Sequence, residues 1–222
     1  RSVLYDKEGN FICSAQQEFN QFFPKDGWVE HNPEDIWQSV LSTLQKLVKE
    51  SGITSSEIAS IGITNQRETT LIWNKKTGNP IHNAIVWQDR RTSEFCHELG
   101  SCENIIQKST GLTIDPYFSA TKIHWLLNNV EGAKEQALNG DLLFGTVDTF
   151  LIWKLTEGRC HKTDITNASR TMLFNIAEQK WDDDLLDIFG IPRQILPEVC
   201  DNVSDYGMTK VLGGEVSIGG VA

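Results

Sequence analysis

Three features are scarce in this sequence: long apolar runs, an excess of basic residues, and cysteine spacings that bind metal. No uninterrupted apolar stretch is long enough to cross a bilayer, and Arg1 begins directly at a strand-like run without a secretory leader pattern. The formal net charge of -10 and the pI near 5.0 disfavour electrostatic binding to nucleic acid or to an anionic membrane. We therefore expect a cytoplasmic protein with no membrane span and no nucleic-acid partner.

Metal and redox motifs are also missing. The five cysteines are odd in number and none belongs to a C-x-x-C pair, so we expect free thiols. The five histidines form neither H-x-x-x-H nor H-E-x-x-H, the spacings that hold zinc on one helix face. The residues therefore predict no structural metal site.

The composition is that of a folded globular chain, with 39% hydrophobic and 23% charged residues in 222. Asn32 and Pro33 have the residue types of a helix start, and apolar residues then recur at helical spacing to Gly52. Strands are expected at 2–5, 11–19, 58–64, 69–73, 81–86 and 142–146, and further helices at 122–130, 148–155 and 181–189. Hairpins followed by helices that alternate with apolar strands predict an α/β domain with a mixed central sheet flanked by helices.

An adjacent cation and carboxylate follow the strand expected at 58–64. Gln66, Arg67 and Glu68 stand where that strand leaves the sheet, and α/β domains bind ligands at the carboxyl ends of their strands. The Arg67 guanidinium offers several donors and the Glu68 carboxylate accepts, so together they suit the hydroxyls of a small polyol. A surface ion pair without function is the alternative.

Two aromatic residues are the next candidates. Trp87 follows the strand expected at 81–86 and offers an apolar face for a carbon backbone together with an indole N–H. Tyr117 lies in a turn set by Pro116, which presents its hydroxyl as a donor or an acceptor. A core tryptophan and a loop-packing tyrosine are the structural alternatives.

Six blocks, in order, resemble the glycerol kinases within the FGGY family of carbohydrate kinases. They are 27–33 (GWVEHNP), 62–70 (GITNQRETT), 83–91 (NAIVWQDRR), 111–122 (GLTIDPYFSATK), 144–149 (FGTVDT) and 163–174 (TDITNASRTMLF). The pattern Tyr117-x-Ser119-x-x-Lys122-Ile123-x-Trp125-Leu126 is similar to the first signature of the family. The block 62–70 is the one that separates glycerol kinases from their xylulose and gluconate relatives.

The resemblance implies an actin-like, ribonuclease H-like domain that holds its substrate in a cleft. It implies that Arg67, Glu68 and Tyr117 hydrogen-bond the hydroxyls of glycerol, that Trp87 lies along the carbon chain, and that Gln66 supports them from behind. The implied reaction transfers the γ-phosphoryl group of ATP to a terminal hydroxyl of glycerol, with Mg²⁺ neutralising charge. A homo-oligomer is implied for the intact protein.

The resemblance also implies that parts of the catalytic machinery lie outside these residues. Family members begin with a strand and an Asp-x-Gly-Thr-Thr-Ser loop for ATP phosphates, and Arg1 matches the arginine that closes this loop and approaches the transferred phosphate. They continue into a Gly-Asp-Gln motif, whose aspartate is the general base, and a second domain that binds adenosine. We therefore expect residues 1–222 to form a substrate-binding domain that is incomplete at both ends, lacks the general base and is inactive alone.

Two alternatives stay open. One is another FGGY kinase acting on a different polyol or ketose, and the other is a truncated, non-catalytic binding or assembly module. Convergence of Arg67, Glu68 and Tyr117 on a space of three-carbon size would disfavour the first alternative. Asp148 and residues 163–174 are interpreted as structural despite their strong match.

Overall fold

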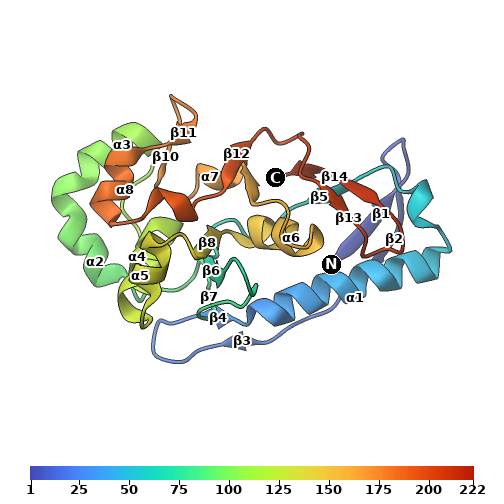
Figure 1. Cartoon of the computed structure of the whole chain (residues 1–222), viewed down its shortest axis with the longest axis horizontal. Coiled ribbons are helices and arrows are strands. Elements are labelled where there is room, and N and C mark those ends of the chain that lie inside the picture. The colour runs from blue at the N-terminus through green and yellow to red at the C-terminus, as the bar shows by residue number, and fades with distance from the viewer.

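Short strands and helices alternate along residues 1–222, all of which the computed structural model describes (Figure 1). The α-helices are α1 (Pro33–Ser51), α2 (Ser93–Glu98), α3 (Glu103–Thr110), α4 (Ser119–Asn129), α5 (Ala133–Leu138), α6 (Val147–Leu155), α7 (Ile165–Ala168) and α8 (Asp183–Phe189). The strands are β1 (Ser2–Tyr5), β2 (Phe11–Ala15), β3 (Gln21–Phe22), β4 (Glu30–His31), β5 (Ile61–Ile63), β6 (Leu71–Asn74), β7 (Ala84–Ile85), β8 (Leu142–Gly145), β9 (Lys162–Asp164), β10 (Phe174–Asn175), β11 (Lys180–Trp181), β12 (Glu198–Cys200), β13 (Met208–Thr209) and β14 (Val216–Val221). The predicted α/β class is confirmed.

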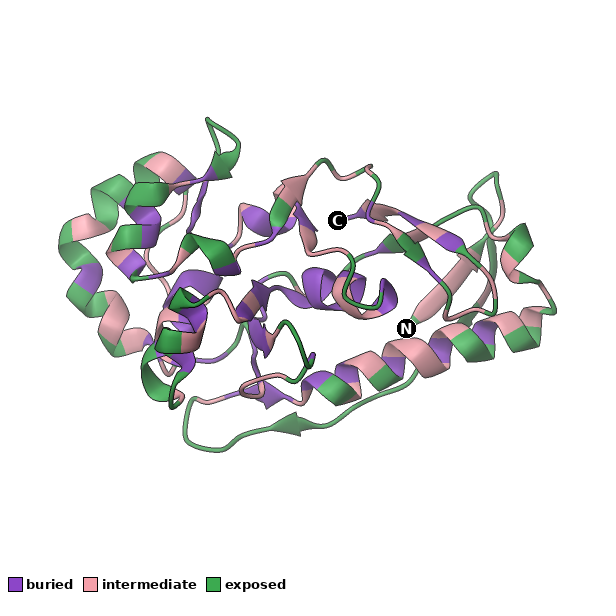
Figure 2. Cartoon of the chain, viewed as in Figure 1, coloured by how far each residue is buried: buried purple, intermediate pink, exposed green.

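The longest helix, α1, has the predicted ends. The Asn32 side chain accepts a hydrogen bond from the backbone N–H of Glu34 (2.9 Å), and Pro33 is the first helical residue. Gly52 ends the helix at a φ of 72°, a left-handed conformation that glycine adopts without strain. Figure 2 shows buried and exposed positions alternating along α1, so one face covers the interior and the other meets solvent.

The sheet that carries β5 is mixed, as predicted. β14 pairs in parallel with β5 and antiparallel with β13. However, β5 covers Ile61–Ile63 rather than 58–64, and it is not buried on both faces. Gly62 is exposed, and no other atom lies within 4 Å of the place where its Cβ would be. The prediction of a strand buried on both faces is therefore wrong: Ile63 is buried, whereas Gly62, on the opposite face, is exposed.

Strand β6 lies between two hydrophobic cores. Ile72 belongs to a core of 23 buried residues around α4 and α8, whereas Leu71 and Trp73 belong to a core of 13 around α1 and α6. This division follows from the strand geometry, because successive side chains point to opposite faces. The predicted pairing of β6 with the following strand is present, since Thr70 and Ile85 exchange two backbone hydrogen bonds. These hydrogen bonds hold the turn before β6 and the loop after β7 next to each other.

The chain beyond Gly158 holds elements that its weak periodicity did not predict. β9 and β12 pair in parallel, and α7 follows β9 directly with Asp164 as its cap. Trp181 lies in β11 and not in a helix, so the predicted helix 181–189 is two residues too long and starts at Asp183. None of the helices combines the length and the apolar character needed to span a membrane.

The cap of α1 offers a direct test of this local structure. Replacing Asn32→Ala leaves the Glu34 N–H without its acceptor and should lower the free energy of unfolding by about 1 kcal/mol. Urea unfolding followed by circular dichroism measures the change. Asn32→Ser is the matched control and should stay within a few tenths of a kcal/mol of the wild type, because serine also caps helices; equal losses in both variants would contradict the capping role.

Candidate functional site

Glu68 is a buried carboxylate at the turn between β5 and β6. The residue is 4% exposed, and its Oε1 accepts a hydrogen bond from Nε of Arg170 at 2.7 Å. Its other oxygen, Oε2, receives no donor from the protein, yet it is not among the fully buried unpartnered atoms. A charge-assisted hydrogen bond of this kind offsets part of the cost of burying a carboxylate. One carboxylate oxygen is therefore held and the other remains reachable from solvent.

Lys122, on α4, ties this turn to the loop before the helix. Its side chain is fully buried, and its ammonium donates to the backbone carbonyls of Glu68 (3.2 Å), Tyr117 (2.5 Å) and Phe118 (3.4 Å). Burial lowers the pKa of Lys122 to about 7, although the nearby carboxylates of Asp89, Glu68 and Asp115 oppose the shift. The contact fixes the position of Tyr117 relative to Glu68.

Tyr117 and Trp87 form an aromatic corner beside this ion pair. Their rings meet edge to face with centroids 5.5 Å apart, and the Arg170 guanidinium lies 5.7 Å from the Tyr117 ring. Asp115 joins the two loops, because one carboxylate oxygen accepts from the backbone N–H of Tyr117 and from the side chain of Arg90. Trp87 stays 36% exposed, so its indole is available to a ligand.

A second buried arginine anchors the loop that carries Trp87. Arg91 donates to Asp89 and to Glu30, with its side chain fully buried and its guanidinium 3.8 Å from the centre of the Trp28 ring. Breaking such a buried pair leaves an uncompensated charge and costs about 3–5 kcal/mol. The loop is therefore held rigidly on both sides of Arg90.

Arg67 and Gln66, the other predicted residues of this turn, do not contact the aromatic corner through the interactions described above. Arg67 occupies the same turn as Glu68 but is exposed, and no ion pair or cation–π contact joins it to the others. The Gln66 amide nitrogen lies 3.2 Å from Nδ1 of His31. Burial lowers the pKa of His31, which favours a neutral ring whose Nδ1 accepts this hydrogen bond. This hydrogen bond joins the turn to β4, whereas the supporting role predicted for Gln66 at a ligand site stays a prediction.

Arg1 lies apart from the cluster. It is exposed at the start of β1, and Figure 1 places the N-terminal end beside α1 while α4, which carries Lys122, lies on the opposite side of the molecule. Its predicted approach to a transferred phosphate stays a prediction. In contrast, Glu68, Trp87 and Tyr117 are brought together by contacts that come from three separate segments.

Asp148 fits the structural role expected for it. Its carboxylate is fully buried and accepts hydrogen bonds from Thr146, Thr163 (2.8 Å) and the side-chain amide of Asn65 (3.0 Å). Burial raises the pKa of Asp148 to about 6, despite the hydroxyl donors. Because Asn65 directly precedes Gln66, this carboxylate fixes the start of the turn that bears Glu68.

Sequence reasoning missed Arg170 and the role of Lys122. Residues 163–174 were interpreted as structural, yet this stretch contributes the guanidinium that pairs with Glu68. Lys122 was noted only as part of the family signature. The one available signal was that both are cations within strongly matching blocks, and neither spacing nor periodicity indicates a partner 102 or 54 residues away.

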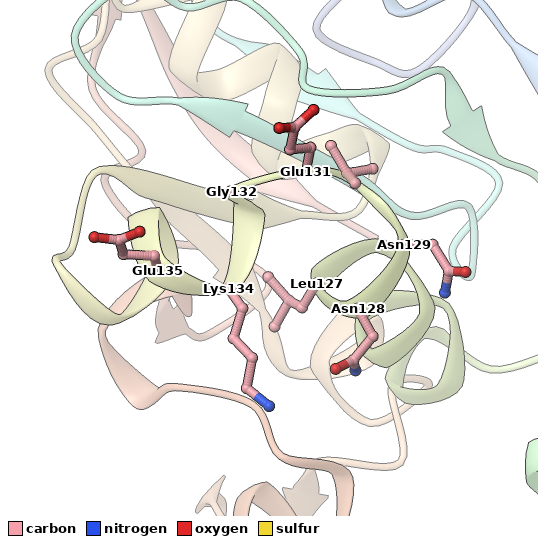
Figure 3. A pocket seen from close by; sticks show the side chains of 8 residues that line it. Leu127, Asn128, Asn129, Glu131, Gly132, Lys134 and Glu135 are labelled. Carbon is pink, nitrogen blue, oxygen red and sulfur yellow. The ribbon is translucent and has the colours of Figure 1, made fainter.

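Two cavities lie away from the aromatic corner. Figure 3 shows a polar cavity of about 430 Å³ at the corner between α4 and α5, lined among others by Asn128, Glu131 and Lys134. A second cavity of about 490 Å³ lies beside α3 and β11. Neither includes Glu68, Trp87 or Tyr117.

Comparison with known proteins assigns the chain to a family. The model of the FGGY family of carbohydrate kinases, N-terminal domain, matches residues 1–214. The chain therefore belongs to the FGGY family of carbohydrate kinases. This agrees with the mixed α/β fold and with the resemblance found in the sequence.

The relatives most similar in sequence include glycerol kinases. Those of Alteromonas mediterranea and Pasteurella multocida are 56% and 59% identical over 100% and 96% of this chain, which covers 46% and 43% of their own lengths. The chain thus spans about half the length of the curated relatives it matches. The crystal structure of Plasmodium falciparum glycerol kinase with ADP matches 99% of this chain and 45% of that one, with a TM-score of 0.93 and 37% identity. A gluconate kinase from Lactobacillus acidophilus, at 23% identity and a TM-score of 0.86, shares the fold.

The buried ammonium of Lys122 predicts a pH-dependent stability. Because the folded-state pKa of about 7 lies below the ordinary 10.5, the unfolded chain binds more protons between these values and stability rises with pH across them. Lys122→Met removes this rise. Between pH 7 and pH 9 the difference in unfolding free energy between wild type and variant should grow by about 2 kcal/mol, measured by urea unfolding.

Lys7→Met is the matched control, since Lys7 is exposed in the β1–β2 turn. It should show the same pH profile as the wild type. A Lys122→Met profile parallel to that of the wild type would mean that the ammonium titrates normally and is not desolvated.

Proposed function

We propose that this chain supplies the glycerol-binding half of an ATP-dependent glycerol kinase and forms the substrate-binding domain of that enzyme. The single observation that supports this most strongly is the grouping of one reachable carboxylate oxygen of Glu68 with the Tyr117 phenol and the exposed indole of Trp87. A triol needs hydrogen-bond acceptors and donors along one edge and an apolar surface along its carbon chain. These three side chains offer that combination within one small area.

The proposed roles follow from the chemistry of each group. Glu68 Oε2 accepts from one or two neighbouring hydroxyls, and the Tyr117 hydroxyl donates or accepts at the next. The Trp87 indole covers the C–H face of the ligand, which excludes water from that side. Arg67, exposed in the same turn, closes over the ligand from solvent and donates to a hydroxyl oxygen. The terminal hydroxyl is then oriented for phosphoryl transfer, which is largely a matter of positioning.

The nucleotide and metal are assigned to no residue of this chain. No group of three His, Cys, Asp or Glu side chains here is arranged to hold a metal ion. Mg²⁺ in enzymes that transfer phosphoryl groups is held mainly by waters, nucleotide phosphates and one or two carboxylates, so no Mg²⁺ ligand is assigned in this chain. When bound, Mg²⁺ and ATP would supply the phosphoryl group and the neutralising charge. We place the reaction in the cytoplasm, a proposal supported by five cysteines that are all unpaired.

Glycerol is favoured over other FGGY substrates by sequence similarity. The curated relatives at 54–59% identity are named glycerol kinases, whereas solved xylulose and gluconate kinases match at 23% identity or less. The low-identity matches bear on the fold alone. This similarity therefore favours a three-carbon ligand over one of five or six carbons.

Removing one hydroxyl tests this proposal. We expect the chain to bind glycerol with a dissociation constant of about 1 mM or weaker, because a three-carbon ligand has few atoms from which to gain affinity. Tyr117→Phe keeps the ring against Trp87 and removes one hydrogen bond, so it should weaken binding about fivefold. Titration with ¹³C-labelled glycerol, followed by NMR of ligand and protein, measures both values.

Tyr5→Phe is the matched control, because Tyr5 is exposed in the β1–β2 hairpin. It should leave glycerol binding unchanged, and D-xylulose at equal concentration should not displace glycerol. Loss of binding in both tyrosine variants, or stronger binding of the ketose than of glycerol, would contradict the proposed substrate.

A further inference from the structure

Arg170 is a functional-site cation that the proposed roles do not use. It reaches Glu68 from 102 residues away, and this contact uses only its Nε–H, at 2.7 Å from Oε1. Its side chain is 32% exposed, and its guanidinium lies 4.9 Å from the Phe118 ring centre and 5.7 Å from that of Tyr117. The guanidinium thus touches both the carboxylate and the aromatic corner.

The segment that carries Arg170 is held in place independently of this pair. The fully buried Asp164 caps α7, accepting from the backbone N–H groups of Thr166 and Asn167. One residue beyond Arg170, the carbonyl of Thr171 accepts from the backbone N–H of Ala120 at 2.9 Å, which docks the segment on the start of α4. Arg170 therefore projects from a preorganised turn and not from a loose loop.

We propose that Arg170 is a positioning residue that fixes the orientation of the Glu68 carboxylate. By binding Oε1, the guanidinium sets the side-chain torsion of Glu68 and leaves Oε2 as the only carboxylate oxygen free to accept from a ligand hydroxyl. It also supplies a charged hydrogen-bond partner to a carboxylate whose side chain is only 6% exposed. The part of this inference that concerns a ligand rests on the proposed function.

A fixed orientation strengthens binding, because a mobile Glu68 side chain would lose conformational entropy when a ligand binds. A carboxylate that is already held in the binding geometry accepts a hydroxyl without losing further torsional freedom. A methionine at position 170 preserves most of the packing against Phe118 but removes both the charge and the donor. Lysine preserves the charge but lacks the planar Nε–H that meets Oε1.

The first experiment needs no ligand. The Nε–H groups of Arg91, Arg159 and Arg170 all donate hydrogen bonds, so ¹⁵N NMR of the wild-type chain should show the Arg170 signal among the protected arginine resonances. Glu68→Gln should weaken the protection of that one signal at least tenfold and leave that of Arg91 unchanged. Arg193→Met is the matched control, because Arg193 belongs to an exposed pair with Asp183 and its loss should leave the protected signal unchanged. If no wild-type Nε–H signal responds to Glu68→Gln, the ion pair does not hold the carboxylate and the inference is overturned.

The second experiment is a double-mutant cycle on glycerol binding with Arg170→Met, Glu68→Gln and the double variant. Arg170→Met should weaken binding about tenfold in the wild-type background and less than twofold in the Glu68→Gln background, with Arg170→Lys intermediate. Arg193→Met should have no effect. Equal losses in both backgrounds, or no loss with Arg170→Met, would refute action through Glu68.

The two experiments separate this inference from the proposed function. If the wild-type chain binds no glycerol at any concentration, the proposed function fails, while the Nε–H signal still decides whether Arg170 holds the carboxylate. If glycerol binds but the cycle shows no coupling, the substrate is correct and the positioning role of Arg170 is wrong.

Discussion

The buried ammonium of Lys122 is the contact on which the geometry of the site depends. A charge sealed from water is tolerated only when its donors are satisfied, and here the acceptors are backbone carbonyls from the β5–β6 turn and from the loop before α4. Since the acceptors are backbone atoms, the clamp fixes where Glu68 and Tyr117 stand without using their side chains. The Tyr117 hydroxyl and the Oε2 atom of Glu68 remain available to a ligand.

The other internal charges extend the same arrangement. Arg91 is neutralised by Asp89 and Glu30 and holds the loop of Trp87, while Arg170 neutralises Glu68. The Arg91–Glu30 and Arg170–Glu68 pairs each join segments that are distant in the sequence. The Arg91–Glu30 pair would be costly to break because both of its side chains are buried. The site is therefore built from short loops whose flexibility has been removed by ion pairs rather than by regular secondary structure.

The local elements of the fold could be predicted because their causes are local. Asn32, Pro33 and Gly52 define α1 through capping and backbone geometry that involve neighbouring residues alone. The prediction failed where pairing is distant: β9 joins β12 across more than thirty residues, and β5 pairs with β14 from the far end of the chain. Residue type and periodicity contain no information about such partners.

For the site, the sequence by itself determined which chemical groups are present and next to which strands they stand, so Glu68, Trp87 and Tyr117 could be selected from it. Only the tertiary structure decided which of them meet, that Arg67 stays in solvent, and that Arg170 supplies the partner of Glu68. The physical reason is that the sequence fixes the chemistry of each side chain. The orientation of a buried carboxylate, in contrast, depends on a partner that long-range packing brings to it.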